Sequence, residues 1–200
     1  MRLFLKPLSS FLIAGGVVLF AWPFGQTLYG KWSQRTLAAQ FAASQKGAPL
    51  SAKAKGKILP VSAKKKMAIA PWPLTKISVP GIGLNAYVVQ GWDEAHLRRG
   101  PGHYELSAPL GEGNCVIMGH RNVYGSPFGD LDKLFPGTPV VLQNQSGTFT
   151  YIVDSTSVAS ASDWRVTLPP PSGARPVLTL LTCTLPHTPN RVVVRALLAK

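Results

Sequence analysis

Short runs of apolar and β-branched residues, broken by Gly and Pro, dominate the chain from residue 70 to its end. Runs of four to six residues have the length of ordinary strands. Seven such runs cover residues 76–79, 85–90, 114–118, 139–143, 148–153, 177–182 and 191–195. Asn144-Gln-Ser-Gly147 separates two of these runs and is typical of a hairpin turn.

Residues 70–200 are therefore predicted to form an all-β domain with only short helices, at residues 93–98 and 127–134. Either a closed barrel or a sandwich would protect the strand edges of such a domain. The periodicity alone does not choose between these two architectures.

The N-terminal pattern is different, because no charged residue occurs between Pro7 and Gly30. The apolar centre, residues 11–24, reaches roughly 20 residues with its flanks, about the thickness of a bilayer core. Trp22 and Tyr29 suit a membrane interface. We therefore predict an N-terminal transmembrane helix that anchors the protein, within residues 1–30. A cleaved signal peptide is the competing interpretation, since Arg2 and Lys6 precede the apolar centre.

Residues 31–69 are predicted to be a basic linker rich in Ala and Lys. Within it, residues 32–45 could form a short helix with Leu37, Ala38 and Phe41 on one face. Three segments follow: an anchor (1–30), a linker (31–69) and a folded domain (70–200).

The net charge of +13 first suggests a nucleic-acid partner, but its distribution argues against one. Residues 1–66 contain 11 Lys and Arg and no acidic residue, whereas residues 67–200 balance 10 basic against 8 acidic residues. Residues 46–66 contain none of the aromatic residues that single-stranded nucleic acids require. The two Cys exclude a disulfide framework and a four-ligand zinc site. We predict no nucleic-acid partner, no cofactor and no metal.

Three residues in the folded domain could carry chemistry. Cys183 ends one apolar run, Arg191 opens the next, and His120 follows an earlier run. Consecutive strands joined by a short loop are normally antiparallel neighbours, which would place Cys183 beside Arg191. A Cys nucleophile, a His that moves protons and an Arg that holds a developing oxyanion together suit acyl transfer. By spacing alone, each residue could equally be structural.

The local sequence resembles that of the sortase family. Thr179-Leu-Leu-Thr-Cys183, followed by Arg191 at the head of the next strand, resembles the TLxTC signature of that family. Gly119-His-Arg121 resembles the block that carries the sortase histidine. The resemblance covers roughly residues 72–197, nearly the whole predicted domain.

The resemblance implies a closed eight-stranded β-barrel that works as a cysteine transpeptidase. Cys183 would be the nucleophile, His120 the general acid and base, and Arg191 the donor to the substrate carbonyl or oxyanion. Thr182 would help to shape the pocket. The substrates would be proteins with a C-terminal LPxTG-like sorting signal, and the acceptor an amine of the cell envelope, or water.

The resemblance also implies a location. The N-terminus would lie in the cytoplasm and the barrel outside the cytoplasmic membrane, in the periplasm or another extracytoplasmic space. The compact form is most similar to the Gram-negative class of sortases.

Three further expectations concern the site. His103 is the main rival of His120 and is expected to line the cleft as a substrate-binding residue. Cys115 is five strand residues from His120 and faces the opposite side, so we predict a buried free thiol rather than a disulfide with Cys183. Asp163 is expected to cap a turn.

A non-enzymatic, membrane-tethered β-barrel that binds envelope polymers is the alternative function. An L,D-transpeptidase is less favoured, since no His-Gly pair precedes Cys183.

Overall fold

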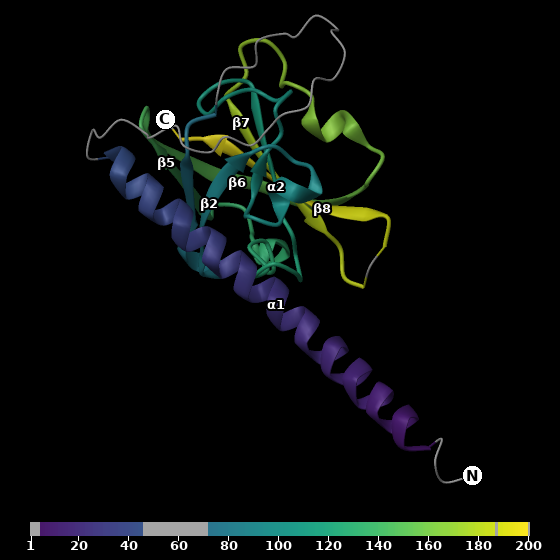
Figure 1. Cartoon of the computed structure of the whole chain (residues 1–200). Coiled ribbons are helices and arrows are strands. Elements are labelled where there is room, and N and C mark those ends of the chain that lie inside the picture. Colours follow the sequence, from purple (N-terminus) through teal and green to yellow (C-terminus); the bar gives the residue numbers. More distant parts are fainter. Residues whose placement is uncertain (1–4, 46–71, 187, 200) are drawn as a thin grey trace, which may run out of the picture.

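The computed structural model describes residues 5–45, 72–186 and 188–199, and shows a long N-terminal helix against a closed β-barrel (Figure 1). The strand order around the barrel is β1-β2-β3-β4-β7-β8-β6-β5, and β5 closes on β1. The all-β prediction and the eight-stranded closed barrel are therefore confirmed.

The strands lie close to the predicted positions. Their bounds are β1 Thr75–Val79, β2 Leu84–Gln90, β3 Gly102–His103, β4 Asn114–Met118, β5 Pro139–Asn144, β6 Gly147–Ser160, β7 Val177–Cys183 and β8 Asn190–Leu198. The predicted hairpin joins β5 to β6. Two features differ from the prediction: β3 has only two residues, too few to leave a pattern, and β6 continues through the polar residues 154–160.

Four short helices lie between the strands. They are the α-helix α2 Glu94–Leu97 and the 3-10 helices η1 Pro80–Ile82, η2 Leu131–Lys133 and η3 Trp164–Thr167. Helix α2 and helix η2 fall within the two predicted helical segments. Helix η3 lies in the connection between β6 and β7, beside the functional site described below.

Alternate positions of the strands fill the barrel. Leu178 and Leu180 of β7 point into the core with Val192 and Val194 of β8. Burying side chains of this size stabilises the fold by about 1.5–3 kcal/mol each. The intervening positions of these strands face outward, and there Leu181 of β7 and Val193 of β8 form a second apolar cluster with Val116 of β4. This outer cluster forms the floor of the site.

Helix α1 (Leu5–Gln45) has 41 residues and includes Pro23. Its later part packs on the barrel through one face, with buried residues at Gly30, Ser33, Leu37, Phe41 and Ser44. The spacing of three or four residues places them on one side of a helix. The predicted packing face at Leu37 and Phe41 is therefore confirmed.

The earlier part of α1 extends away from the barrel (Figure 1). It exposes apolar side chains, among them Val17, Leu19, Trp22 and Phe24. Among the described residues, however, no helix combines the length and apolar character needed to cross a membrane, so the predicted transmembrane helix is not confirmed.

The predicted linker also needs a correction. Residues 31–45 continue α1 and lie against β2, because Gln34 bonds to the backbone of Tyr87. The rest of the predicted linker, residues 46–69, lies outside the described residues.

Candidate functional site

The register of the barrel strands brings Cys183 and Arg191 together. Strands β7 and β8 are antiparallel, and Cys183 lies directly opposite Arg191 in their ladder. Leu181 and Val193 are the next pair on the same face, since side chains alternate along a strand. The backbone ladder alone therefore fixes the separation of the thiol-bearing and guanidinium-bearing residues.

His120 reaches the same place from β4. Strands β4 and β7 are parallel, and their last pair is Met118 with Leu181. His120 lies two residues after Met118, and Cys183 lies two residues after Leu181. The same register therefore brings both residues to one rim of the barrel. His120, Cys183 and Arg191 line one pocket of about 320 Å³ on the outer face.

Two side chains tie the histidine segment to the end of β7. The Thr182 hydroxyl donates a hydrogen bond of 2.8 Å to the carbonyl oxygen of Gly119, the residue before His120. Arg121, the residue after His120, donates from Nη1 to the carbonyl oxygen of Cys183 at 3.2 Å. Asp132 holds the other end of the Arg121 guanidinium at 2.6 Å. These bonds fix the backbones on both sides of the pocket relative to each other.

The surroundings of His120 favour the neutral form of its ring. Burial lowers the pKa of His120, and the charge of Arg98 lowers it further, while Glu94 opposes both. Nε2 of His120 is buried and has no hydrogen-bond partner among the described residues. A neutral imidazole with an unbonded nitrogen at a pocket can accept or deliver a proton.

The rest of the pocket is mostly apolar. Its wall and floor come from β4, β6, β7, β8 and the connection that contains η3, and include Trp92, Leu97, Met118, Ala159, Trp164, Val166, Leu181 and Val193. Trp92 and Trp164 are each more than two-fifths exposed and pack edge to face, with ring centroids 5.7 Å apart. Such a groove suits an extended peptide with an apolar side chain.

The structure places the other predicted residues as follows. Thr182 is buried and lines the pocket. Asp163 caps η3 by accepting from the Arg165 amide, as predicted. Cys115 is a buried free cysteine on the inner face of β4, which confirms that prediction, and burial raises the pKa of its thiol far above the usual value.

His103, the rival histidine, lies away from the pocket. The residue is 5% exposed, its ring stacks on Trp72 with centroids 3.8 Å apart, and it is not among the residues that line the pocket. Its Nε2 lies 3.1 Å from the Ser107 hydroxyl and 3.3 Å from the Ala108 carbonyl oxygen. His103 is thus packed away from this pocket, and a role for it in substrate binding stays a prediction that the packing does not support.

Three groups that contribute to the site were missed by sequence reasoning. Arg121 stands in the quoted Gly-His-Arg motif, but only the fold shows that it reaches Cys183. Trp92 and Trp164 belong to separate loops and carry no local signal. Leu181 and Val193 were not singled out, although the continuous apolar run of β7 indicates burial on both faces.

Comparisons with known proteins agree with this geometry. A family model described as a sortase domain matches residues 77–199. Sortase E from Streptomyces avermitilis superposes with a TM-score of 0.58 at 36% identity, over 64% of this chain and 89% of that structure. Sortase A from Corynebacterium diphtheriae superposes with a TM-score of 0.59 at 29% identity, over 64% of this chain and 61% of that structure.

Curated relatives give shorter matches. Sortase SrtE1 from Streptomyces coelicolor is 40% identical over 78 residues, which is 36% of this chain and 22% of that protein. Sortase A from Streptococcus agalactiae is 26% identical over 130 residues, 62% of this chain and 52% of that protein. The chain therefore spans about a fifth to a half of the length of these relatives.

Proposed function

Because the chain belongs to the sortase family, whose members are cysteine transpeptidases, we propose that it cleaves proteins at a C-terminal LPxTG-like sorting signal. The acyl part of the substrate is then transferred to an amine of the cell envelope, or to water. The observation that carries this proposal is the single pocket lined by Cys183, His120 and Arg191.

In the first half-reaction, the thiol of Cys183 gives its proton to the His120 ring as its sulfur attacks the carbonyl carbon of the scissile peptide bond. The guanidinium of Arg191 stabilises the negative charge that develops on the carbonyl oxygen. The carbon–nitrogen bond breaks as the leaving amine takes a proton from His120. The product of this step is a thioester between Cys183 and the substrate, with His120 neutral.

In the second half-reaction, an acceptor amine enters the same pocket. His120 takes a proton from this amine as its nitrogen attacks the thioester carbonyl. A new amide bond forms, the bond to sulfur breaks, and His120 returns the proton to the sulfur, which restores the Cys183 thiol and the neutral His120 ring. Water can replace the amine, in which case the product is a carboxylic acid.

The apolar wall supports a peptide substrate with an apolar residue in its sorting signal. Leu181 and Val193 form the floor of the pocket. Each lies two residues along its strand from Cys183 or Arg191, on the same face. A side chain about two residues before the scissile bond would lie over them, since an extended peptide repeats its direction every second residue.

We also propose that the N-terminal part of α1 attaches the protein to the cytoplasmic membrane, with the barrel on the outer side. This rests on the uncharged stretch from Pro7 to Gly30 and on the exposed side chains of Val17, Val18 and Trp22. Fractionation of cells after a carbonate wash tests it: the full chain should stay with the membranes. Recovery of the full chain in the soluble fraction would contradict the attachment.

The transpeptidase is tested with the full chain and a quenched peptide that contains an LPxTG-type signal, with and without an added amine. We expect cleavage, a faster turnover with the amine, and a mass increase on Cys183 that corresponds to the thioester. Cys183→Ala is the matched control and should be inactive while it keeps the fold. A folded wild-type chain that cleaves none of a panel of sorting peptides would favour the non-enzymatic alternative.

A further inference from the structure

Helix α1 contacts the barrel at the loop that follows His120. Gly30 approaches the backbone of Tyr124 so closely that a methyl group added at Gly30 would lie 2.2 Å from the Tyr124 carbonyl oxygen. The preceding residue, Tyr29, meets the Tyr124 ring edge-on, with centroids 6.4 Å apart and planes at 76°. Two consecutive residues of the helix therefore press on one residue of the loop, and glycine is needed for the approach.

Tyr124 also contacts the candidate catalytic histidine, His120. The centroids of the Tyr124 and His120 rings lie 5.3 Å apart, and the ring planes make an angle of 40°. The guanidinium of Arg98 lies 5.8 Å from the Tyr124 ring centroid. Tyr124 is thus held between the helix, Arg98 and the imidazole.

The backbone of Tyr124 is in an unfavourable conformation. Its φ is +52°, in the left-handed region, and Ser126 has a φ of +51°. A side chain other than glycine costs about 1–2 kcal/mol there, and such residues persist only where the surroundings hold them. The contacts from α1 are surroundings of this kind.

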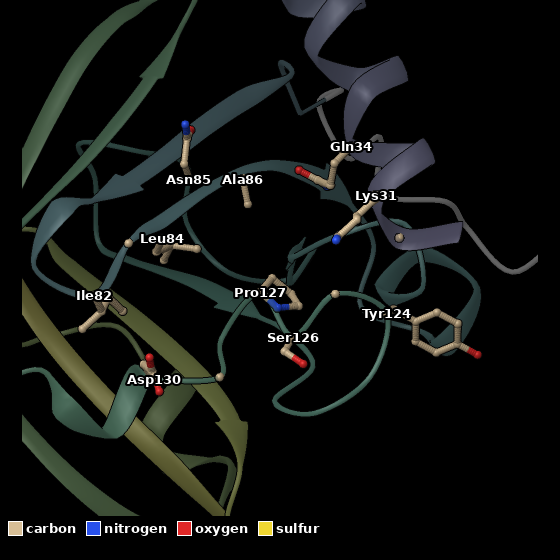
Figure 2. Close-up of a pocket in the computed structure, with 15 residues that line it drawn as sticks. Lys31, Gln34, Ile82, Leu84, Asn85, Ala86, Tyr124, Ser126, Pro127 and Asp130 are labelled. Atoms are coloured by element: carbon tan, nitrogen blue, oxygen red, sulfur yellow. The ribbon is translucent and has the colours of Figure 1, made fainter. Parts of the chain in front are cut away.

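The far side of the loop does not rest on the barrel wall. A cleft of about 460 Å³ separates the segment Tyr124–Pro127 from Leu84, Asn85 and Ala86 of β2 (Figure 2). Lys31 and Gln34 of α1 line the same cleft from the other side. The helix therefore provides support at a place where the strand does not touch the loop.

The position of α1 along the barrel is itself fixed. Gln34 donates from Nε2 to the carbonyl oxygens of Tyr87 at 3.2 Å and Arg99 at 2.8 Å, and its Oε1 accepts from the Tyr87 amide at 2.7 Å. Sliding the helix by one residue would break all three bonds. Tyr29 and Gly30 consequently meet Tyr124 in one defined register.

No hydrogen bond among the described residues fixes Nε2 of His120. We propose that Tyr29 and Tyr124 are positioning residues, through which the docked helix α1 holds the His120 ring in the orientation for proton transfer. This inference rests on the proposed role of His120 in the transpeptidase. It makes the N-terminal helix a part of the active enzyme as well as an attachment.

The test uses the full chain and three variants of adjacent residues. Tyr29→Ala removes the edge contact, Tyr29→Phe keeps the ring, and Leu28→Ala truncates a neighbouring side chain that is 67% exposed. For each variant, kcat and KM are measured with the sorting peptide and an amine. The ring signals of His120 are recorded by NMR on histidine-labelled protein and assigned with His120→Gln.

We expect Tyr29→Ala to lower kcat by ~10-fold or more, because small misplacements of a catalytic group are costly, and to leave KM within about twofold. Its His120 ring signals should shift or broaden. Tyr29→Phe and Leu28→Ala should match the wild type in both measurements. Unchanged kcat together with unchanged His120 signals in Tyr29→Ala would overturn the inference.

Two further outcomes separate this inference from the proposed function. If the wild type has no transpeptidase activity, the function is wrong, while the NMR comparison still tests the contact from α1 to His120. If Tyr29→Ala is poorly folded, Gly30→Ala replaces it, since the added methyl group must displace Tyr124 and move the His120 signals. Unmoved signals in a folded Gly30→Ala chain would also overturn the inference.

Discussion

His103 and His120 each follow a glycine, but the structure surrounds their rings differently. His103 lies inside a packed region, stacked on Trp72 and bonded through Nε2 to the Ser107 hydroxyl and the Ala108 carbonyl. His120 lines the pocket with Cys183, and its Nε2 has no partner in the described part of the chain. Burial lowers the pKa of both rings.

The comparison shows that a lowered pKa does not identify a catalytic histidine by itself. In His103 the low pKa accompanies a buried ring that stacks on Trp72 and does not line the pocket, so a substrate in the pocket has no access to it. In His120 it accompanies a ring that lines the same pocket as Cys183, the proposed nucleophile. Access to the reacting atoms, rather than burial, distinguishes the two.

The largest expected effect comes from removing each imidazole in turn. His120→Ala should lower kcat by ~10²- to 10⁴-fold, the usual contribution of general acid–base catalysis. His103→Ala should keep kcat within a few-fold when the rate is normalised to folded protein. The measurement is cleavage of the quenched sorting peptide at a temperature where both variants are folded by circular dichroism.

The reverse ranking of these two variants would contradict the assignment of His120. Chemical shift assignments then offer a second check, because addition of a non-cleavable sorting peptide should move the His120 ring signals and leave those of His103 in place. Equal movement of both rings would remove the distinction.

The second effect concerns the positive charge of Arg191, which lines the pocket with His120 and Cys183. Arg191→Lys keeps a positive charge but replaces a planar group with several donors by a single ammonium. We expect a loss of ~10²- to 10³-fold in kcat, as for other donors to an oxyanion. Arg195→Lys, on the same face of the same strand and four residues further along, is the matched control and should stay close to the wild type. Near wild-type kcat in Arg191→Lys would remove Arg191 from the mechanism.

Much of the barrel could be predicted from the sequence, because its strands alternate or bury both faces and are separated by Gly and Pro. Strand β3 could not, since two residues show no period. A helix over residues 32–45 was expected, but its docking against β2 was not, because the bonds between Gln34 and Tyr87 join segments that are far apart in the chain. Local pattern indicates an element, whereas its docking depends on what it packs against.

The residues of the site also divide into those that the sequence could place and those that it could not. Cys183 and Arg191 lie side by side because a short connection joins their consecutive strands. The sequence was therefore sufficient to predict that these two residues are neighbours. The approach of His120 depends on the parallel pairing of β4 with β7, which are distant in the chain. The contacts of Tyr124 and of His103 depend on side-chain packing between distant segments, and no local pattern encodes them.

The third effect concerns stability and follows from His103. Burial lowers the pKa of His103 to about 4, against 6.5 for an unfolded chain. The folded state therefore binds fewer protons than the unfolded state below pH 6.5, and stability falls as the pH decreases from about 6.5 towards 4. From this difference, His103 alone should remove up to about 3 kcal/mol by pH 4.

His103→Gln tests this expectation, because glutamine can still donate to the Ala108 carbonyl but does not titrate. Urea unfolding of the wild type and the variant at pH 4, 5, 6 and 7 gives the free energy of unfolding. The variant should lose less stability than the wild type between pH 7 and pH 4, by up to about 3 kcal/mol. Identical pH dependence of the two chains would show that His103 does not stay neutral in the folded state.

The smallest expected effect concerns the bond that joins the His120 segment to the nucleophile strand. Thr182→Val keeps the shape of the side chain and leaves the buried Gly119 carbonyl without its donor, at a cost of about 1–3 kcal/mol. If the bond also positions His120 against Cys183, kcat should fall by about tenfold with little change in KM. Thr138→Val is matched to it, since that hydroxyl donates at the same 2.8 Å to the Phe135 carbonyl, outside the pocket. If both variants lose similar stability and only Thr182→Val loses kcat, the Thr182 bond contributes to the geometry of catalysis. If kcat is equal in the two variants, Thr182 is a structural residue.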